Sequence, residues 1–275
     1  MNIKIFQIYY DPKQYPLLDK AFIPYDNTAN LNPIWREYYI FRTAFFNNEY
    51  KQADYVGYLS WKFNDKTKVA GEKFIEFIKQ NPDYDVYYIN PFLRVSLPYN
   101  NIWKEAKYCH PTLLPFIRRM CAKMGISPGY DKLAMPFEKF CYSNFWVGSQ
   151  KFWEHYIAFM EPFYHYLTTQ LSPSDEKILY KPSDKTTDAV LAPFIMERLF
   201  TTFLCLNEKK IKSIGYKYSW NEIWQNYSIH NFIFLYLYLR FNINIKKMFF
   251  YRWPMELLSY YKTRFWGHIP KETFF

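Results

Sequence analysis

A strongly apolar segment that carries two adjacent charges, Ala189 to Leu204, constrains this chain more than any other. Its apolar residues recur at the spacing of a helix buried around most of its circumference: Val190, Leu191, Phe194, Ile195, Leu199, Phe203 and Leu204. Glu197 and Arg198 stand inside this pattern, and a charge in an apolar helix is costly unless it is paired or has a chemical role. Two interpretations stay open: half of a structural ion pair, or a carboxylate held beside a cleft as a general base.

The composition narrows the class of protein. A chain of 275 residues can hold one large domain, or a domain with an appendage, around a real core. With 7 glycines it contains neither a P-loop nor a GxGxxG fingerprint, which argues against a P-loop NTPase and an ordinary dinucleotide-binding protein. Lys and Arg total 35 against 25 Asp and Glu, a net charge of +10 that favours anionic partners: nucleotides, nucleic acid or an acidic membrane.

Cysteine usage and hydropathy indicate the compartment. Cys109, Cys121, Cys141 and Cys205 show neither CxxC nor zinc spacing, so we expect free thiols in a reducing cytoplasm. The first residues show no basic leader before a long apolar run, and no uncharged run is long enough to cross a bilayer. We therefore expect a cytoplasmic protein, with peripheral contact to the inner membrane as an addition.

Strand and helix signals alternate along the chain. Apolar, β-branched and aromatic runs predict strands at Ile3–Tyr10, Ala53–Phe63, Asp85–Phe92, Asn144–Val147 and Lys210–Tyr218. Helical periodicity covers Asn32–Phe46, Val69–Lys79, Leu113–Met124, a segment from Lys151 onward, and Ala189–Leu204. This alternation predicts an α/β fold with a mostly parallel central sheet flanked by helices, formed by residues 1–218.

Some residues are candidate ligand contacts from their position alone. Gln7 and Tyr9 lie near the end of the first strand, where α/β proteins bind ligands, although strand polarity also explains them. Arg118 and Arg119 suit a diphosphate, with a solvated helix face as the alternative.

Four segments resemble a bacterial family of capsule and lipopolysaccharide glycosyltransferase-like proteins. They are the Trp35 and Glu37 region of Asn32–Tyr39, DYVGYLSWKF at Asp54–Phe63, SNFWVG at Ser143–Gly148, and FIMERLF at Phe194–Phe200. The order strand, turn, helix, polar loop, acidic helix, strand resembles the second half of inverting GT-A glycosyltransferases. The resemblance spreads over roughly residues 1–218.

The resemblance implies a GT-A-like (Rossmann-like) fold that transfers a sugar from a nucleotide-sugar to a glycan or lipid-linked acceptor in surface polysaccharide synthesis. Glu197 would be the catalytic base, since desolvation raises the pKa of a carboxylate in apolar surroundings. The expected donor-binding residues are Gln7, Tyr9, Asp54, Lys62, Arg118 and Arg198. The expected acceptor-binding residues are Trp61, Asn144 and Trp146.

The metal requirement stays open at the level of sequence. Asp83 and Asp85 have the letters of an Asp-x-Asp motif, but they precede a strand instead of following one, so we interpret them as loop and cap residues. Either a divalent ion, Mn²⁺ or Mg²⁺, or cationic side chains would stabilise the leaving diphosphate.

The pattern changes after Tyr218, and we expect residues 219–275 to form a helical C-terminal extension. Ile229–Leu239 is apolar but too short to span a membrane, and Lys246–Phe275 interleaves basic and aromatic residues. The extension is interpreted either as a contact to an anionic membrane or as a lid on the domain.

Two other classes of protein fit parts of the sequence. A nucleic-acid-binding protein would also be basic and aromatic, but the basic residues here are spread out and no nucleic-acid motif occurs, so we expect no nucleic-acid partner. A non-catalytic sugar-binding protein would keep the fold and lose the base.

Overall fold

The strand β3, Tyr55–Ser60, lies in the middle of the protein and is almost entirely buried. Val56 and Tyr58 point into one apolar cluster and Leu59 into the other, as alternation along a strand requires when both faces of a sheet are covered. The computed structural model describes residues 1–96, 99–126, 129–182, 190–219 and 221–223.

Six strands form the described sheet, in the order β2-β1-β3-β5-β4-β6. The others are β1 (Ile3–Tyr9), β2 (Ile23–Asp26), β4 (Val86–Tyr88), β5 (Trp146–Ser149) and β6 (Ser213–Gly215). Parallel pairs join β2 to β1, β1 to β3, and β4 to β6, whereas β5 runs antiparallel to both β3 and β4. The fold class predicted from the sequence, α/β with a mostly parallel sheet, is confirmed.

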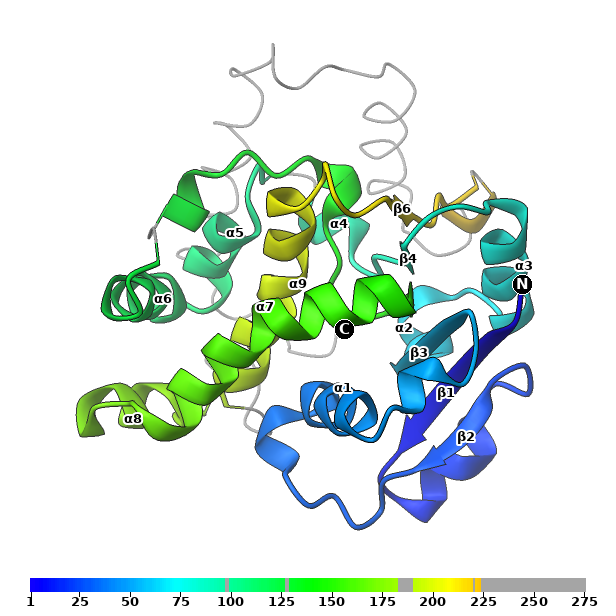
Figure 1. Ribbon diagram of the computed structural model, residues 1–275, viewed down its shortest axis with the longest axis horizontal. Coiled ribbons are helices and arrows are strands. Elements are labelled where there is room, and N and C mark those ends of the chain that lie inside the picture. The colour runs from blue at the N-terminus through cyan, green and yellow to red at the C-terminus, as the bar shows by residue number, and fades with distance from the viewer. Residues whose placement is uncertain (97–98, 127–128, 183–189, 220, 224–275) are drawn as a thin grey trace, which may run out of the picture.

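Helices cover both faces of this sheet (Figure 1). Helices α2 (Phe63–Thr67) and α3 (Gly71–Gln80) contribute to the smaller apolar cluster on one face. The larger cluster, on the other face, is built by α1 (Glu37–Phe46), α5 (Ile102–Cys109), α6 (Leu113–Lys123), α7 (Gln150–Thr169) and α9 (Ala192–Leu206). The remaining helices are α4 (Leu93–Ser96), α8 (Pro173–Leu179), and the 3₁₀ turns η1 (Pro12–Leu17), η2 (Pro33–Trp35), η3 (Glu49–Lys51), η4 (Gly129–Lys132) and η5 (Phe137–Lys139).

Several elements differ from the sequence prediction. The helix expected over Asn32–Phe46 is interrupted at Arg36, whose φ of 50° and ψ of −133° cannot continue a helix. The strand expected over Ala53–Phe63 ends at Ser60, because α2 begins at Phe63. Within Lys210–Tyr218 only Ser213–Gly215 pairs as a strand.

The expected C-terminal extension falls largely outside the described residues. Of residues 219–275 the structure describes 219 and 221–223. The segments Ile229–Leu239 and Lys246–Phe275 lie outside the described residues, and the domain boundary at 218 stays a prediction. None of the helices in the described part of the chain combines the length and the apolar character that crossing a bilayer requires.

The packing of β3 against β5 gives a first prediction. A Cβ atom added at Gly57 would lie 2.7 Å from both the carbonyl oxygen of Trp146 and Cγ2 of Val147. Gly57→Ala should therefore lower the free energy of unfolding by roughly 1–3 kcal/mol, the usual cost of overpacking, as measured by urea denaturation.

A second glycine provides the control for this experiment. Gly125 has no atom within 4 Å of an added Cβ, and its φ of +67° leaves only a backbone penalty of about 1–2 kcal/mol in Gly125→Ala. An unaltered stability in Gly57→Ala would contradict the close approach of the two strands.

Candidate active site at the carboxyl edge of the sheet

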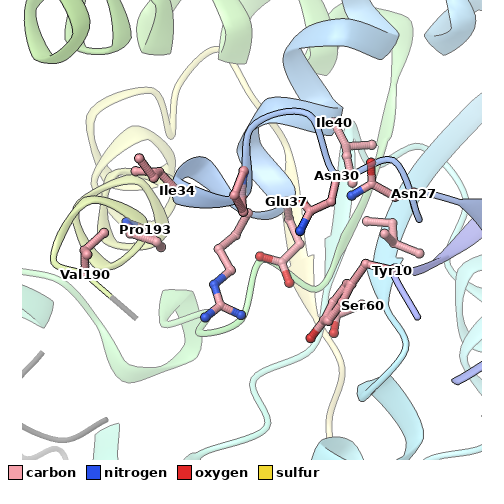
Figure 2. A pocket seen from close by; sticks show the side chains of 12 residues that line it. Tyr10, Asn27, Asn30, Ile34, Glu37, Ile40, Ser60, Val190 and Pro193 are labelled. Carbon is pink, nitrogen blue, oxygen red and sulfur yellow. The ribbon is translucent and has the colours of Figure 1, made fainter. Parts of the chain in front are cut away.

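A cavity of about 290 Å³ opens where β1 and β3 end, the edge at which α/β sheets bind their ligands. The strands supply Ile8 and Ser60, the residue after β1 is Tyr10, and the loop after β2 supplies Asn27 and Asn30. The opposite wall consists of Pro33, Ile34, Arg36, Glu37 and Ile40 around the start of α1, with Val190 and Pro193 at the start of α9. Segments far apart in sequence thus meet around one space (Figure 2).

The unusual backbone of Arg36 positions the carboxylate in this cavity. The chain changes direction at Arg36 between η2 and α1, so Glu37 falls in the first turn of α1. A carboxylate is favoured there by the partial positive charge of a helix N-terminus. Figure 2 shows the Glu37 carboxylate directed toward the side of the cavity that Asn30, Tyr10 and Ser60 line.

Glu197 lies one helical turn after Pro193 of the cavity wall, on the same face of α9. Its side chain is 17% exposed. The backbone N–H of Ser143 donates a 2.7 Å hydrogen bond to Oε2 of Glu197. The carboxylate is therefore fixed to the turn that leads into β5.

The backbone of that turn is held in an unfavourable conformation. Ser143 and Asn144 have φ angles of 63° and 54°, a left-handed conformation that is costly for residues other than glycine. Because β5 is antiparallel to its neighbours, its beginning, and with it this turn, lies at the carboxyl edge of the parallel strands. Both side chains are more than nine-tenths buried, and Oδ1 of Asn144 has no hydrogen-bond partner.

Lys66 of α2 reaches the same turn from the other side. Its Nζ donates a 3.0 Å hydrogen bond to Oγ of Ser143 and lies 5.7 Å and 5.9 Å from the ring centroids of Phe92 and Phe145. Burial lowers the pKa of Lys66, while the carboxylates of Glu37 and Glu197 act in the opposite direction.

The pKa of Glu197 is raised, as its apolar surroundings predicted. Burial is the largest cause, whereas Arg198, Lys66 and the N–H of Ser143 favour the ionised form, and the charge of Glu37 disfavours it. A carboxylate with a raised pKa is a stronger base than one in water, so its environment suits proton abstraction.

Arg198 forms a buried ion pair with Glu105. Its Nη2 donates to Oε2 of Glu105, on α5, at 2.5 Å, and both side chains are 3% exposed. Nη1 of Arg198 lies 3.9 Å from Oε1 of Glu197 and donates to the carbonyl oxygen of Phe194. Arg198 therefore forms the buried ion pair that ties α9 to α5, and Glu197 lies beside this pair, held by the N–H of Ser143.

The structure separates the other expected donor-binding residues. Gln7 has no exposed surface; its Nε2 donates to the carbonyl oxygen of Trp61 and its Oε1 accepts from the N–H of Asp19, so it fastens two loops together. Tyr9 lies at the end of β1 in a ring contact with Tyr15. Asp54 precedes β3 and accepts from the N–H of Asn2, at the opposite end of the strand from Ser60 of the cavity wall.

Lys62 and Trp61 lie just after β3, beside the cavity. Nζ of Lys62 lies 5.0 Å from the ring centroid of Trp61, whose indole N–H donates to the hydroxyl of Tyr10. Arg118 is exposed on α6, away from the cavity wall, and the adjacent Arg119 pairs with Asp175 of α8.

Trp146 occupies the core instead of a surface. It has no exposed area and makes ring contacts with Phe41 and Trp153, among others, because its position in β5 faces the larger apolar cluster. An acceptor sugar cannot stack on a ring in that position. Asn144, in contrast, lies in the turn that holds Glu197.

Sequence reasoning left three residues out of the site: Glu37, Lys66 and Ser143. Glu37 and Ser143 fell within segments that resemble the glycosyltransferase-like family, which was a usable signal. Lys66 lies in a polar run after Phe63 and looks like a solvated lysine, because its partner Ser143 is distant in sequence.

A second cavity, of about 600 Å³, opens where β4 and β6 end. The rings of Phe137, Tyr216 and Tyr218 line it together with the polar side chains of Asn90 and Lys139. In the strand order, β5 separates this cavity from the first one, so the turn at Ser143 and Asn144 lies between the two.

The described residues do not group three or more His, Cys, Asp or Glu side chains in a way that would hold a metal ion. Asp85 accepts from the N–H of Lys212 and pairs with Lys151, and Asp83 has a φ of 70°, consistent with the loop and cap interpretation. Among the thiols that the structure describes, Cys121, Cys141 and Cys205 are free, as expected.

Comparison with known proteins gives one informative result. No protein-family model and no curated protein matches the sequence. Among solved structures, the fold is similar to that of WbbM, a bifunctional glycosyltransferase in its apo form, with a TM-score of 0.51 and 14% identity. The match covers 79% of this chain and 44% of that chain, so the present chain spans less than half of that protein. At this identity the likeness concerns the fold.

Proposed function

We propose that the chain is an inverting glycosyltransferase that moves a sugar from a nucleotide-sugar to a hydroxyl group of a glycan or lipid-linked acceptor in surface polysaccharide synthesis. The observation that carries the proposal is the partly buried carboxylate of Glu197, which is hydrogen-bonded to the turn that lies between two cavities at the carboxyl edge of the sheet. A two-substrate transfer needs this arrangement: one site for each substrate and a base between them. The fold shared with a glycosyltransferase supports the proposal.

The cavity at β1 and β3 would take the nucleotide-sugar. Glu37 and the amides of Asn27 and Asn30 offer acceptors and donors for hydroxyl groups of the ribose or the sugar. Lys62 and Arg36, beside and within the cavity, supply positive charge for the diphosphate. The described residues give a metal ion no evident ligand set, and we assign no step to one.

The cavity at β4 and β6 would take the acceptor. The rings of Phe137, Tyr216 and Tyr218 suit the apolar faces of a pyranose, and Asn90 and Lys139 suit its hydroxyl groups. Its greater volume fits an acceptor of more than one sugar ring.

The reaction that follows is a single displacement. Glu197 accepts the proton of the acceptor hydroxyl while that oxygen forms a bond to the anomeric carbon. The bond from the anomeric carbon to the phosphate oxygen breaks, and the nucleoside diphosphate leaves with the electron pair. Attack on the face opposite the leaving group inverts the anomeric configuration.

A thermal-shift panel of nucleoside diphosphates and nucleotide-sugars tests the donor site. We expect one nucleotide class to stabilise the protein by about 2.7 kcal/mol at a hundredfold excess over its Kd, seen as a rise in melting temperature of roughly 5–10 °C. Glu37→Gln should weaken this binding about tenfold, the scale of one hydrogen bond to a charged group.

The exposed Glu72 of α3 serves as the matched control, because Glu72→Gln changes the same charge away from the cavity. A chain that no nucleotide stabilises is not a nucleotide-sugar transferase. Slow release of nucleoside diphosphate from the stabilising nucleotide-sugar, alone or with acceptor, separates an enzyme from a sugar-binding protein that lacks catalysis.

A further inference from the structure

Lys66 is a half-buried lysine that has no role in the proposed reaction. It projects from the short helix α2 and donates to Oγ of Ser143, whose own N–H donates to Glu197. One residue thus bonds a cation through its side chain and a carboxylate through its backbone. Its left-handed φ of 63° is an unfavourable conformation that the surrounding contacts must maintain.

The charges that face Glu197 come from several elements. Arg198 lies next to it on α9, Lys66 reaches it from α2, and Glu37 acts on it from α1. The thiol of Cys141, near the start of β5, is also close enough for its pKa to be raised by the charge of Glu197. These four groups differ in how they affect the ionisation of Glu197.

Of the two cations, Arg198 lowers the pKa of Glu197 more than Lys66 does, but its guanidinium also pairs with a second carboxylate. Its short contact is the 2.5 Å bond to Glu105, so a nearer negative charge already offsets the guanidinium, whereas Glu197 lies at 3.9 Å. Cys141 is a thiol, and Glu37 is a like charge. Lys66 is therefore the cation whose hydrogen-bonded connection leads to Glu197.

We propose that Lys66 is a positioning residue that acts through Ser143 to orient the carboxylate of Glu197 and to keep it ionised near neutral pH. The inference rests on the proposed function only for its effect on turnover, since the charge coupling is a property of the folded chain. Without the Lys66 charge, the balance shifts toward the protonated carboxyl group, which burial and Glu37 favour and which Arg198 and the N–H of Ser143 still oppose. A protonated Glu197 cannot accept the acceptor's proton.

Carboxyl-carbon NMR of the full chain tests the coupling directly. The Glu197 signal is assigned by its loss in Glu197→Gln, and its titration is followed in the wild type and in Lys66→Met. We expect the midpoint to rise by about one pH unit in Lys66→Met, because a nearby opposite charge lowers a carboxyl pKa by that order. Lys66→Arg, which keeps the charge, should restore most of the wild-type midpoint.

Lys68, at the end of the same helix, provides the control. It is exposed and pairs with Asp65 at 3.0 Å, so Lys68→Met removes the same charge without touching the turn. If Lys66→Met fails to fold, Ser143→Ala tests the same connection, since it removes the oxygen that holds Nζ and should move the midpoint in the same direction by less.

Turnover supplies the second measurement. A general base must be ionised, so activity rises with pH through the pKa of Glu197, and Lys66→Met should move this acid limb to higher pH with kcat recovering at high pH. A Glu197 titration that is unchanged in both Lys66→Met and Ser143→Ala would overturn the inference whatever the activity. A shifted titration in a chain without transferase activity would uphold the coupling and refute the proposed function instead.

Discussion

Replacing Glu197 by glutamine should reduce glycosyl transfer by about 10²-fold or more while leaving the protein folded and the nucleotide bound. The amide keeps the shape of the side chain and can still accept the N–H of Ser143, but it cannot take a proton, and loss of a general base has this cost. Stability should not fall much, because the raised pKa means that folding disfavours the charged form that glutamine removes. Turnover, donor affinity and melting temperature on one variant provide the measurement.

Glu72→Gln is again the matched control, with turnover expected to equal that of the wild type. Two results would count against the assignment of Glu197 as base. A folded Glu197→Gln protein with ordinary turnover places the base elsewhere. A large fall in melting temperature would show that Glu197, and not only Arg198, belongs to the structural charge network of α9.

Glu105→Gln should have the largest effect on stability, with a loss of roughly 3–5 kcal/mol in the free energy of unfolding. This change removes the nearer of the two carboxylates that compensate Arg198, and a poorly compensated charge inside a protein is the costly outcome of breaking a buried pair. The melting temperature should fall by about 10 °C for a chain of this size, as measured by calorimetry.

Two further variants show whether the loss of stability in Glu105→Gln arises because the Glu105–Arg198 pair is buried. Asp65→Asn breaks the exposed pair with Lys68 and should cost no more than about 1 kcal/mol. Replacing Glu105 and Arg198 together by apolar residues of similar volume should restore most of the stability lost in Glu105→Gln. A loss in Glu105→Gln as small as that of Asp65→Asn would mean that water reaches the pair.

Elements with a strong apolar period could be predicted from the sequence, and those set by caps or edges could not. β1, β3 and α9 carry long apolar patterns, and each forms close to its expected place. β2 was missed because it is an exposed edge strand with Pro24 inside it, where proline is tolerated but weakens the signal. α8 was hidden in a polar segment, although Ser172 and Pro173 form an ordinary helix start.

Some features of the candidate site could likewise be predicted from local sequence, and others could not. The apolar neighbours of Glu197 in sequence predict its desolvation, because a helix surrounds a residue with its own apolar neighbours. Nothing local predicts that Arg198 pairs with Glu105, or that Trp146 lies in the core while Trp61 lies at the cavity. These distinctions depend on which helix packs on which face of the sheet. The positive φ of Arg36 carries no signature either, since arginine is not a residue that favours it.

The connections around Glu197 also join parts of the chain that are synthesised far apart in time. Ser143 is 77 residues from Lys66 and 54 from Glu197, and Glu105 is 93 residues from Arg198. The turn before β5 and helix α9 also follow β1 and β3 in the chain. A nascent chain that has completed β1, β3 and their cavity residues still lacks both the turn before β5 and the carboxylate of α9. Under the proposed function, such a chain lacks its catalytic base until α9 docks.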